Sequence, residues 1–246
     1  MKNTQPWIPY FPQPVWRFGS VEIHAFGIAA AVALITGYLL CYLRARSQHL
    51  RPNLAAGIYL TGVAAGLMGG RLFGTSVSEG WYRVWNGQSG AGLVLGASAA
   101  GVACYIFLRH TGANPWDYFN VLAFATPSIW TLVRAGCALA HDHIGRPTSS
   151  FLGVQFPGGT RFDLGLLECL AAALISILWI ILLKLRFRRF FPLVFISIGV
   201  TRLALIPFRQ GFSREEWMVF GACVFAGIVL LRFSDQGTVA AKVNAR

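Results

Sequence analysis

The chain is a succession of long apolar runs separated by short polar segments. Seven runs stand out, covering residues 24–43, 54–74, 91–108, 118–140, 164–185, 190–208 and 217–231. An α-helix needs about 20 mostly apolar residues to cross the hydrocarbon core of a bilayer, and most of these runs reach that length. The pattern predicts an all-α polytopic membrane protein with about seven transmembrane helices. We expect residues 1–232 to form a single transmembrane domain and residues 233–246 a cytoplasmic tail.

Composition supports this class and excludes two others. Of the 246 residues, 55% are hydrophobic and only 12% are charged, whereas soluble domains average about 25% charged residues. The aromatic share of 14% is too high for a disordered chain. Residues 1–19 hold four prolines and no uninterrupted apolar run, so we do not expect a signal peptide there. The five cysteines are scattered and predict buried apolar positions, not a disulfide framework or zinc site.

The basic residues exceed the acidic ones by 12. In a soluble protein this excess would suggest nucleic acid, but in a membrane protein it reflects basic cytoplasmic loops and anionic headgroups, so we expect no nucleic-acid partner. One set of alternate inter-run segments holds seven basic residues and the other holds eleven, including the cluster at 184–189. Cytoplasmic loops carry the excess. The asymmetry predicts an outside N-terminus and a cytoplasmic C-terminus.

Two of the segments on the predicted outer face are long. Residues 75–90 carry an aromatic cluster, and residues 141–163 carry His141, Asp142 and His143. Long loops in compact folds tend to be functional. We therefore predict an external, periplasmic-side loop region in which a site is assembled.

Several ionisable side chains fall inside the apolar runs, where charge is costly and usually marks function. They are His24, Arg71, Arg134, Glu168 and Arg202. Snorkelling to the headgroups is the alternative for Arg71 and Arg202. For Arg134 the alternative is a structural ion pair, with the acid supplied by either Glu168 or Asp142.

Arginine is suited to a lipid phosphate, because its planar fork donates two parallel hydrogen bonds. Arginines that converge from different spans would form a headgroup pocket between helices. These residues predict an intramembrane, arginine-lined cavity for an anionic lipid that opens on the outer face.

Five short motifs occur in a fixed order along the chain. They read VEIHAFG at 21–27, GGRL at 69–72, YRVWNG at 82–87, RAG at 134–136 followed by GR at 145–146, and FRQ at 208–210 with Arg202 upstream. Their order and spacing resemble the prolipoprotein diacylglyceryl transferases over about residues 15–231. The fourth motif has the spacing of the family signature, R-x-G-N-x-x-N-x-E-x-x-G-R.

The resemblance implies a reaction and its partners. Family members move the diacylglyceryl group of phosphatidylglycerol to the lipobox cysteine of a preprolipoprotein signal peptide, which forms a thioether and releases glycerol phosphate. It implies residence in the bacterial cytoplasmic (inner) membrane, no metal and no organic cofactor. By matched positions, Arg134 and Arg202 would hold the phosphate, with Arg146 and Arg209 nearby. Arg71 and Glu168 complete the expected substrate-binding set; no feature predicts an oligomeric state.

The chain also departs from the family pattern. The two asparagines of the signature are Cys137 and Ala140, its glutamate is Asp142, and a family histidine falls near Ala91. The arginine framework is retained while its acid–base and amide partners are replaced. A non-catalytic or re-purposed lipid-binding relative is therefore the alternative to a transferase. A transporter is disfavoured, because no internal repeat is visible.

The catalytic base has four candidates. His141, Asp142 and His143 form the acid–base cluster of the external loops, and imidazole titrates near neutral pH. His24 is the fourth, with a hydrogen bond at a helix start as its alternative role. If the helix continued through the loop, Cys137 would share a face with His141 at i, i+4, which suggests a cysteine nucleophile and an acyltransferase. A metal site at His141 and His143 is disfavoured because Asp142 alone would complete it.

Overall fold

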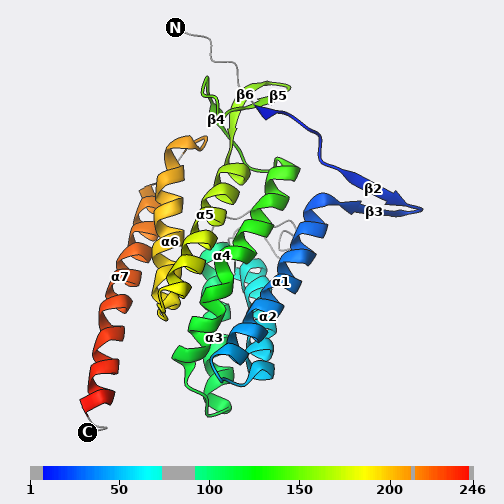
Figure 1. Cartoon of the computed structure of the whole chain (residues 1–246). Helices are drawn as coiled ribbons and strands as arrows, with labels where there is room; N and C mark the ends of the chain where they lie inside the picture. The colour runs from blue at the N-terminus through cyan, green and yellow to red at the C-terminus, as the bar shows by residue number, and fades with distance from the viewer. Residues whose placement is uncertain (1–7, 74–91, 212–213, 244–246) are drawn as a thin grey trace. The chain divides into compact units, whose positions relative to one another are not determined.

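The computed structural model describes residues 8–73, 92–211 and 214–243, and seven α-helices dominate this part of the chain (Figure 1). They are α1 (Ala25–Ser47), α2 (Pro52–Phe73), α3 (Gly92–His110), α4 (Pro115–Ala140), α5 (Leu164–Lys184), α6 (Phe190–Leu205) and α7 (Arg214–Val243). The predicted all-α class is confirmed.

Six helical segments are long and apolar enough to cross a membrane. They are Ala25–Ser47, Pro52–Gly70, Pro115–Ala140, Leu164–Lys184, Phe190–Phe208 and Glu216–Phe233. The protein is therefore a multi-pass membrane protein. Their boundaries follow local chemistry: α2 and α4 begin at prolines, whose missing N–H is no loss in the first turn. The sixth run ends as its Pro207 predicts, because α6 tightens into the 3₁₀ turn η3 (Ile206–Phe208).

The loop after α4 folds into a small sheet that the apolar pattern did not predict. Strands β4 (Ile144–Pro147), β5 (Val154–Phe156) and β6 (Gly159–Asp163) are joined by β1 (Ile8–Pro9) in the order β1-β5-β6-β4. β1 runs parallel to β5, whereas β6 is antiparallel to both β4 and β5. The sheet lies at one shared end of α4, α5 and α6 (Figure 1).

A second pair of strands precedes the first helix. β2 (Val15–Phe18) and β3 (Val21–His24) form an antiparallel hairpin. Its two-residue turn begins at Gly19, whose φ of 61° lies in the left-handed region that glycine adopts without strain. β3 leads directly into α1.

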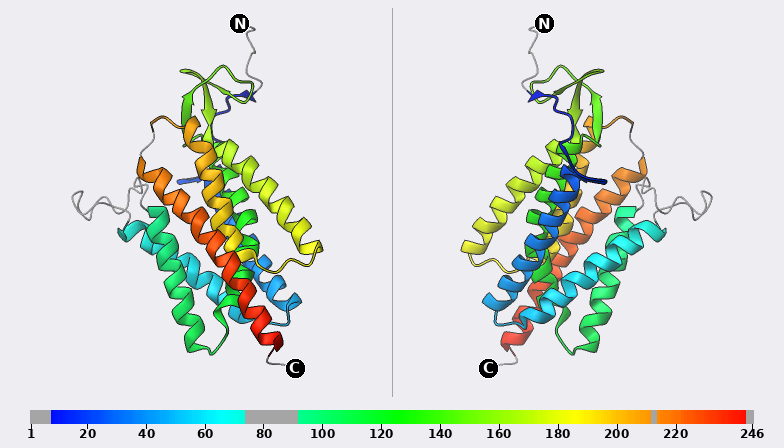
Figure 2. Two further views of the ribbon diagram at one scale, coloured as in Figure 1. Left: turned by 90° about the vertical axis from the view of Figure 1, so that its left-hand side faces the viewer. Right: turned by 90° about the vertical axis from the view of Figure 1, so that its right-hand side faces the viewer.

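The chain divides into two compact units, Met1–Thr36 with Ala123–Arg246, and Gly37–Leu122. In the second unit, α2 and α3 pack side by side through small residues. A Cβ on Gly96 would lie 2.7 Å from the carbonyl oxygen of Gly66, so only glycine permits this approach. In the first unit, α6 and α7 pack in the same way (Figure 2). A Cβ on Gly199 would lie 2.6 Å from Val224 Cγ2.

Candidate functional site

Two largely buried arginines from different helices meet one buried carboxylate. Arg134 Nε of α4 lies 2.6 Å from Glu168 Oε2 of α5, and Arg202 Nη1 of α6 lies 2.9 Å from Glu168 Oε1. The Glu168 side chain is only 4% exposed. Of the two acids that the sequence offered as partners for Arg134, the structure pairs Glu168. The cluster carries one net positive charge, and we call these three residues the arginine triad.

A glycine lets the triad form. Helix α5 begins at Leu164, and a Cβ on Gly165 would lie 2.9 Å from the backbone nitrogen of Ala138. No other residue type fits between α4 and α5 at this contact without a shift of one of them. The close approach brings Glu168, one turn further along α5, up to Arg134. On its other side, Arg202 Cζ lies 5.9 Å from the centre of the Phe220 ring in α7, within cation–π range.

An acid–imidazole pair stands next to the triad. His143 Nδ1 is hydrogen-bonded to Asp142 Oδ1, and His143 Nε2 lies 3.4 Å from Arg134 Nη1. Guanidinium nitrogens only donate, so Nε2 is the acceptor and the ring proton is assigned to Nδ1, which donates to the carboxylate. This tautomer leaves Nε2 as the basic nitrogen. Both side chains of the pair are partly exposed, unlike the triad.

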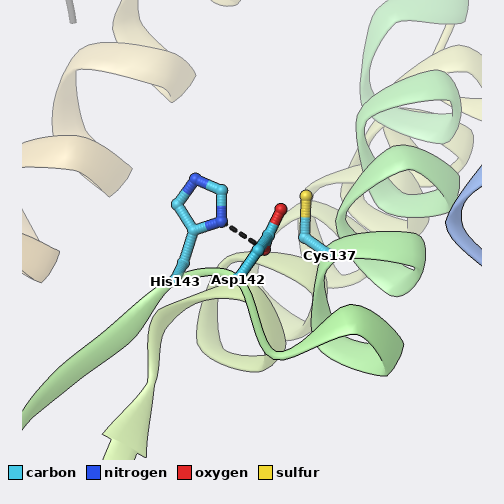
Figure 3. Close-up of side chains that lie close together, drawn as sticks. All are labelled: Cys137, Asp142 and His143. Carbon is cyan, nitrogen blue, oxygen red and sulfur yellow. Dashed lines mark hydrogen bonds and ion pairs between the residues drawn. The ribbon is translucent and has the colours of Figure 1, made fainter. Parts of the chain in front are cut away.

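Cys137 belongs to the same cluster. Its sulfur lies 3.7 Å from Arg134 Nη1, and the ligand-type atoms of Cys137, Asp142 and His143 lie within 4.8 Å of one another (Figure 3). Three such groups suit a metal ion by type. However, the Arg134 guanidinium touches two of them, and its positive charge opposes a bound cation. The arrangement is better suited to moving protons and holding anions.

His141 lies apart from this pair and has a structural setting. Its Nδ1 lies 2.6 Å from Asp163 Oδ2, and its ring packs 5.0 Å from Tyr10 and 5.3 Å from Phe156 between ring centres. Asp163 also caps α5 by accepting from Leu166 N at 3.1 Å. The helix does not continue to His141, as a pairing of Cys137 with His141 would require, because α4 ends at Ala140 and His141 has a φ of 51°. The i, i+4 pairing with Cys137 is lost with it.

Two further predicted arginines, Arg146 and Arg209, have partners near the turn after α6. Arg209 Nη1 lies 2.5 Å from Glu216 Oε1, and Arg146 Cζ lies 5.8 Å from the centre of the Phe208 ring. Gln210 Nε2 donates to the carbonyl oxygen of Gly145 at 2.8 Å. The glycine–arginine end of the signature therefore docks on the turn after α6, which joins two motifs that lie far apart in sequence.

His24 lines an open groove between the hairpin and the end of α4. The groove encloses about 520 Å³. Its lining residues are Gln13, Glu22, Ile23, His24, Phe26, Gly27, Ala140 and Asp142. The groove thus leads from the exposed hairpin to the acid of the acid–imidazole pair.

Some predicted features lie outside the described residues. These are Ala91 and the motif at 82–87, and for Arg71 the structure describes the helix but not the side chain. Conversely, sequence reasoning missed Asp163 and Glu216 as partners of candidate residues. Asp163 had a readable signal, since an aspartate directly before an apolar run is a typical helix N-cap. Glu216 had none, because its partner Arg209 lies across a loop.

Comparison with known proteins assigns the chain that carries this site to a family. A family model described as prolipoprotein diacylglyceryl transferase matches residues 13–233. The chain belongs to this family. The match covers both motifs that meet in the arginine triad, and it confirms the resemblance read from the sequence.

Individual relatives are distant but extensive. A phosphatidylglycerol–prolipoprotein diacylglyceryl transferase of Caldanaerobacter subterraneus subsp. tengcongensis is 28% identical over 156 residues, which are 59% of this chain and 60% of that protein. Proteins of the same name from Francisella tularensis subsp. holarctica and subsp. novicida are each 24% identical over 247 residues, which cover 91% of both chains. The family is thus shared along nearly the whole length.

Proposed function

We propose that this protein transfers the diacylglyceryl group of phosphatidylglycerol to the cysteine thiol of a prolipoprotein lipobox. The observation that carries the proposal is the arginine triad around buried Glu168, with the Asp142–His143 pair beside it. A positive site and an adjacent base are what this transfer requires. The names of the relatives supply the substrates.

The triad is suited to the lipid phosphate. Glu168 fixes two guanidinium groups in place and leaves one net positive charge in a buried setting, where electrostatic attraction is stronger than in water. Arg202 Nε is buried and makes no hydrogen bond within the described part of the chain, so it is free to donate. Arg146 and Arg209 stand nearer the sheet, and we assign them, with Arg71, to the approach of the headgroup.

His143 is the best candidate for the base. Its Nε2 would take the proton of the incoming thiol, and Asp142 would stabilise the imidazolium that forms. The thiolate then attacks the carbon of the diacylglyceryl group that carries the phosphate. The bond between this carbon and the phosphate oxygen breaks, and glycerol phosphate leaves with the electron pair. The arginines would stabilise the developing charge on the leaving group. His141 acts in this scheme as a positioning residue for the loop, and His24 faces the groove that leads to Asp142.

The location of the site follows from the proposed orientation. With the N-terminus outside and the C-terminus cytoplasmic, the sheet and the triad would face the outer leaflet of the bacterial inner membrane. Residues 1–232 would act there as one transmembrane domain, with 233–246 as the cytoplasmic tail. Neither a metal nor an organic cofactor has a role in this scheme.

The experiment is a direct transfer assay. The full chain is reconstituted in bilayers that contain phosphatidylglycerol, a lipobox peptide is added, and the peptide is examined by mass spectrometry for the thioether product. A peptide with serine in place of the cysteine is the control. Phosphatidylglycerol binding without any thioether would overturn the proposal and favour the lipid-binding alternative.

A further inference from the structure

The β2–β3 hairpin has one continuous apolar face. Residues that pair across antiparallel strands lie on the same face, and successive residues alternate between faces. The pairs Trp16–Ile23 and Phe18–Val21 therefore share a face. All four side chains are large, apolar and exposed, with Phe18 at 66% and Val21 at 58%. Exposure of large apolar side chains to water is unfavourable in free energy, so a face of this kind indicates a binding surface.

The opposite face of the hairpin is polar. Arg17 pairs across the strands with Glu22, with Arg17 Nε 2.9 Å from Glu22 Oε1, and the next pair on this face is Val15 with His24. The ion pair is largely exposed, so this face suits water. The hairpin is thus amphipathic, with its polarity divided between its two faces.

The hairpin is tied to the start of a membrane-spanning helix. β3 ends at His24 and α1 begins at Ala25, whose backbone nitrogen donates to the carbonyl oxygen of Pro14 at 3.1 Å. This hydrogen bond closes the base of the hairpin onto the first residue of α1. In Figure 1 the hairpin projects sideways from the end of α1 and does not prolong its axis. A segment with this attachment runs along the bilayer surface when α1 spans the bilayer.

The apolar surface continues from the hairpin onto the helix. Phe26 is 38% exposed and Ile28 is 43% exposed, and both belong to the candidate span that begins at Ala25. The exposed apolar side chains of the hairpin are thus followed along the chain by exposed apolar side chains of a candidate membrane span.

We propose that the β2–β3 hairpin lies in the membrane interface. Trp16, Phe18, Val21 and Ile23 enter the boundary between headgroups and acyl chains, while the Arg17–Glu22 face points to water. Aromatic side chains favour this depth, and amphipathic segments bury their apolar face there by about 5–10 Å. The partner is the lipid bilayer itself, and the inference does not depend on the proposed reaction.

The proposal has a consequence for access to the site. Glu22, Ile23 and His24 of the hairpin form one wall of the groove that reaches Asp142. With the hairpin in the interface, this groove opens at headgroup level. A phospholipid can then present its headgroup to the site while its acyl chains stay in the membrane.

The test compares the two faces of one strand. An environment-sensitive fluorescent amino acid is incorporated at position 18 or, as the matched control, at position 17 of the full chain in phosphatidylglycerol nanodiscs. We expect lipids with a nitroxide near the headgroup to quench the probe at 18 about threefold more strongly than at 17, because the two faces differ in depth. Aqueous iodide should show the reverse preference.

Two results would overturn the proposal. Equal iodide quenching at both positions would place the apolar face in water. Protection of position 18 from both quenchers would show that protein covers the face, either a second copy or a bound peptide. Positions 21 and 22 repeat the comparison on the other strand, so a failure of one variant to fold does not leave the question open.

Discussion

At the scale of single residues, Glu168 holds the site together. It is the one acidic partner that the described ion pairs give to Arg134 and Arg202. Removing one partner of a buried ion pair leaves uncompensated charge and costs about 3–5 kcal/mol. We therefore expect Glu168→Gln to lower thermal stability sharply, as measured by unfolding in detergent.

The matched control for Glu168 is Glu216→Gln. Glu216 also pairs with an arginine, Arg209, but both side chains are partly exposed. Such pairs contribute at most about 1 kcal/mol, so this variant should unfold near the wild-type temperature. Equal destabilisation by the two changes would contradict the central role of Glu168.

Substitutions of the two loop histidines should have different effects on turnover and stability. His143→Asn should lose most turnover, because general-base catalysis typically contributes about 10²–10⁴-fold, and it should keep wild-type thermal stability since the side chain is partly exposed. His141→Asn should instead lower stability by about 1–3 kcal/mol, because buried Asp163 loses a partner. Thermal unfolding and thioether yield are the two measurements. Normal turnover in the His143 variant would exclude it as the base.

The function of Arg134 depends on the planar, forked geometry of its guanidinium group as well as on its positive charge. One guanidinium reaches Glu168 through Nε and both His143 and Cys137 through Nη1. A lysine offers a single point charge. Arg134→Lys should therefore reduce product formation by at least about tenfold, while Arg146→Lys, whose arginine stacks near Phe208, should have a smaller effect. Full activity of the Arg134 variant would show that bidentate geometry is not needed.

Sequence alone could identify the residues of the site but not all of their partners. Arg134, Glu168 and Arg202 stand out because each is a charge within an apolar run. His141 and His143 could not be told apart, since both are histidines of one polar loop. The distinction arises from the left-handed backbone of His141, which turns it toward Asp163 and away from the helix. No pattern of residue types encodes that turn.

At the scale of elements, the approach of α5 to α4 decides whether the triad forms. A Cβ at position 165 would lie 2.9–3.1 Å from Ala138 and Cys137. Gly165→Ala should push the helices apart, lower stability by about 1–3 kcal/mol through overpacking, and reduce transfer by separating Glu168 from Arg134. Unfolding temperature and thioether yield test this.

The control for Gly165 is Gly221→Ala in α7. No atom lies within 4 Å of a Cβ built at position 221, and alanine is favoured over glycine in helices by up to about 1 kcal/mol. This variant should be neutral or slightly more stable. A Gly165 variant that behaves in the same way would contradict the packing argument.

The elements differ in how readily sequence reveals them. Helices of this length are visible because their apolar runs match the bilayer thickness. The sheet was missed because its strands have two to five residues, too few for an alternating pattern to emerge. Its pairing also joins residues 8–9 to 154–155, and a search for local periodicity does not detect a contact over that separation.

At the scale of the whole molecule, strand pairing constrains the membrane topology. Because β1 pairs with β5, the N-terminal segment and the loop before α5 lie on one side of the bilayer. The chain between them must cross an even number of times. The candidate spans that the described residues offer in this stretch are α1, α2 and α4, so we expect α3 to be the fourth crossing. The strand pairing therefore supports seven spans.

Reporter fusions test this topology. Fusions at Ser89 and Phe156 should both read as external, and a fusion at Gly112, between α3 and α4, should read as cytoplasmic. The excess of basic residues in the alternate segments motivates the assignment of sides. A cytoplasmic location of the reporter fused at Phe156 would contradict the seven-span arrangement.

The β1–β5 pairing also sets an order of events during biogenesis. Residues 8–9 leave the ribosome about 145 residues before their partner strand. At a synthesis rate of about 5–20 residues per second, β1 stays unpaired for roughly 7–30 s before β5 has been synthesised. The sheet can close only after α4 has been inserted. A stall or misinsertion of any of the first four helices would leave β1 unpaired, and the loop that carries His141 and His143 would mature without its neighbouring strand.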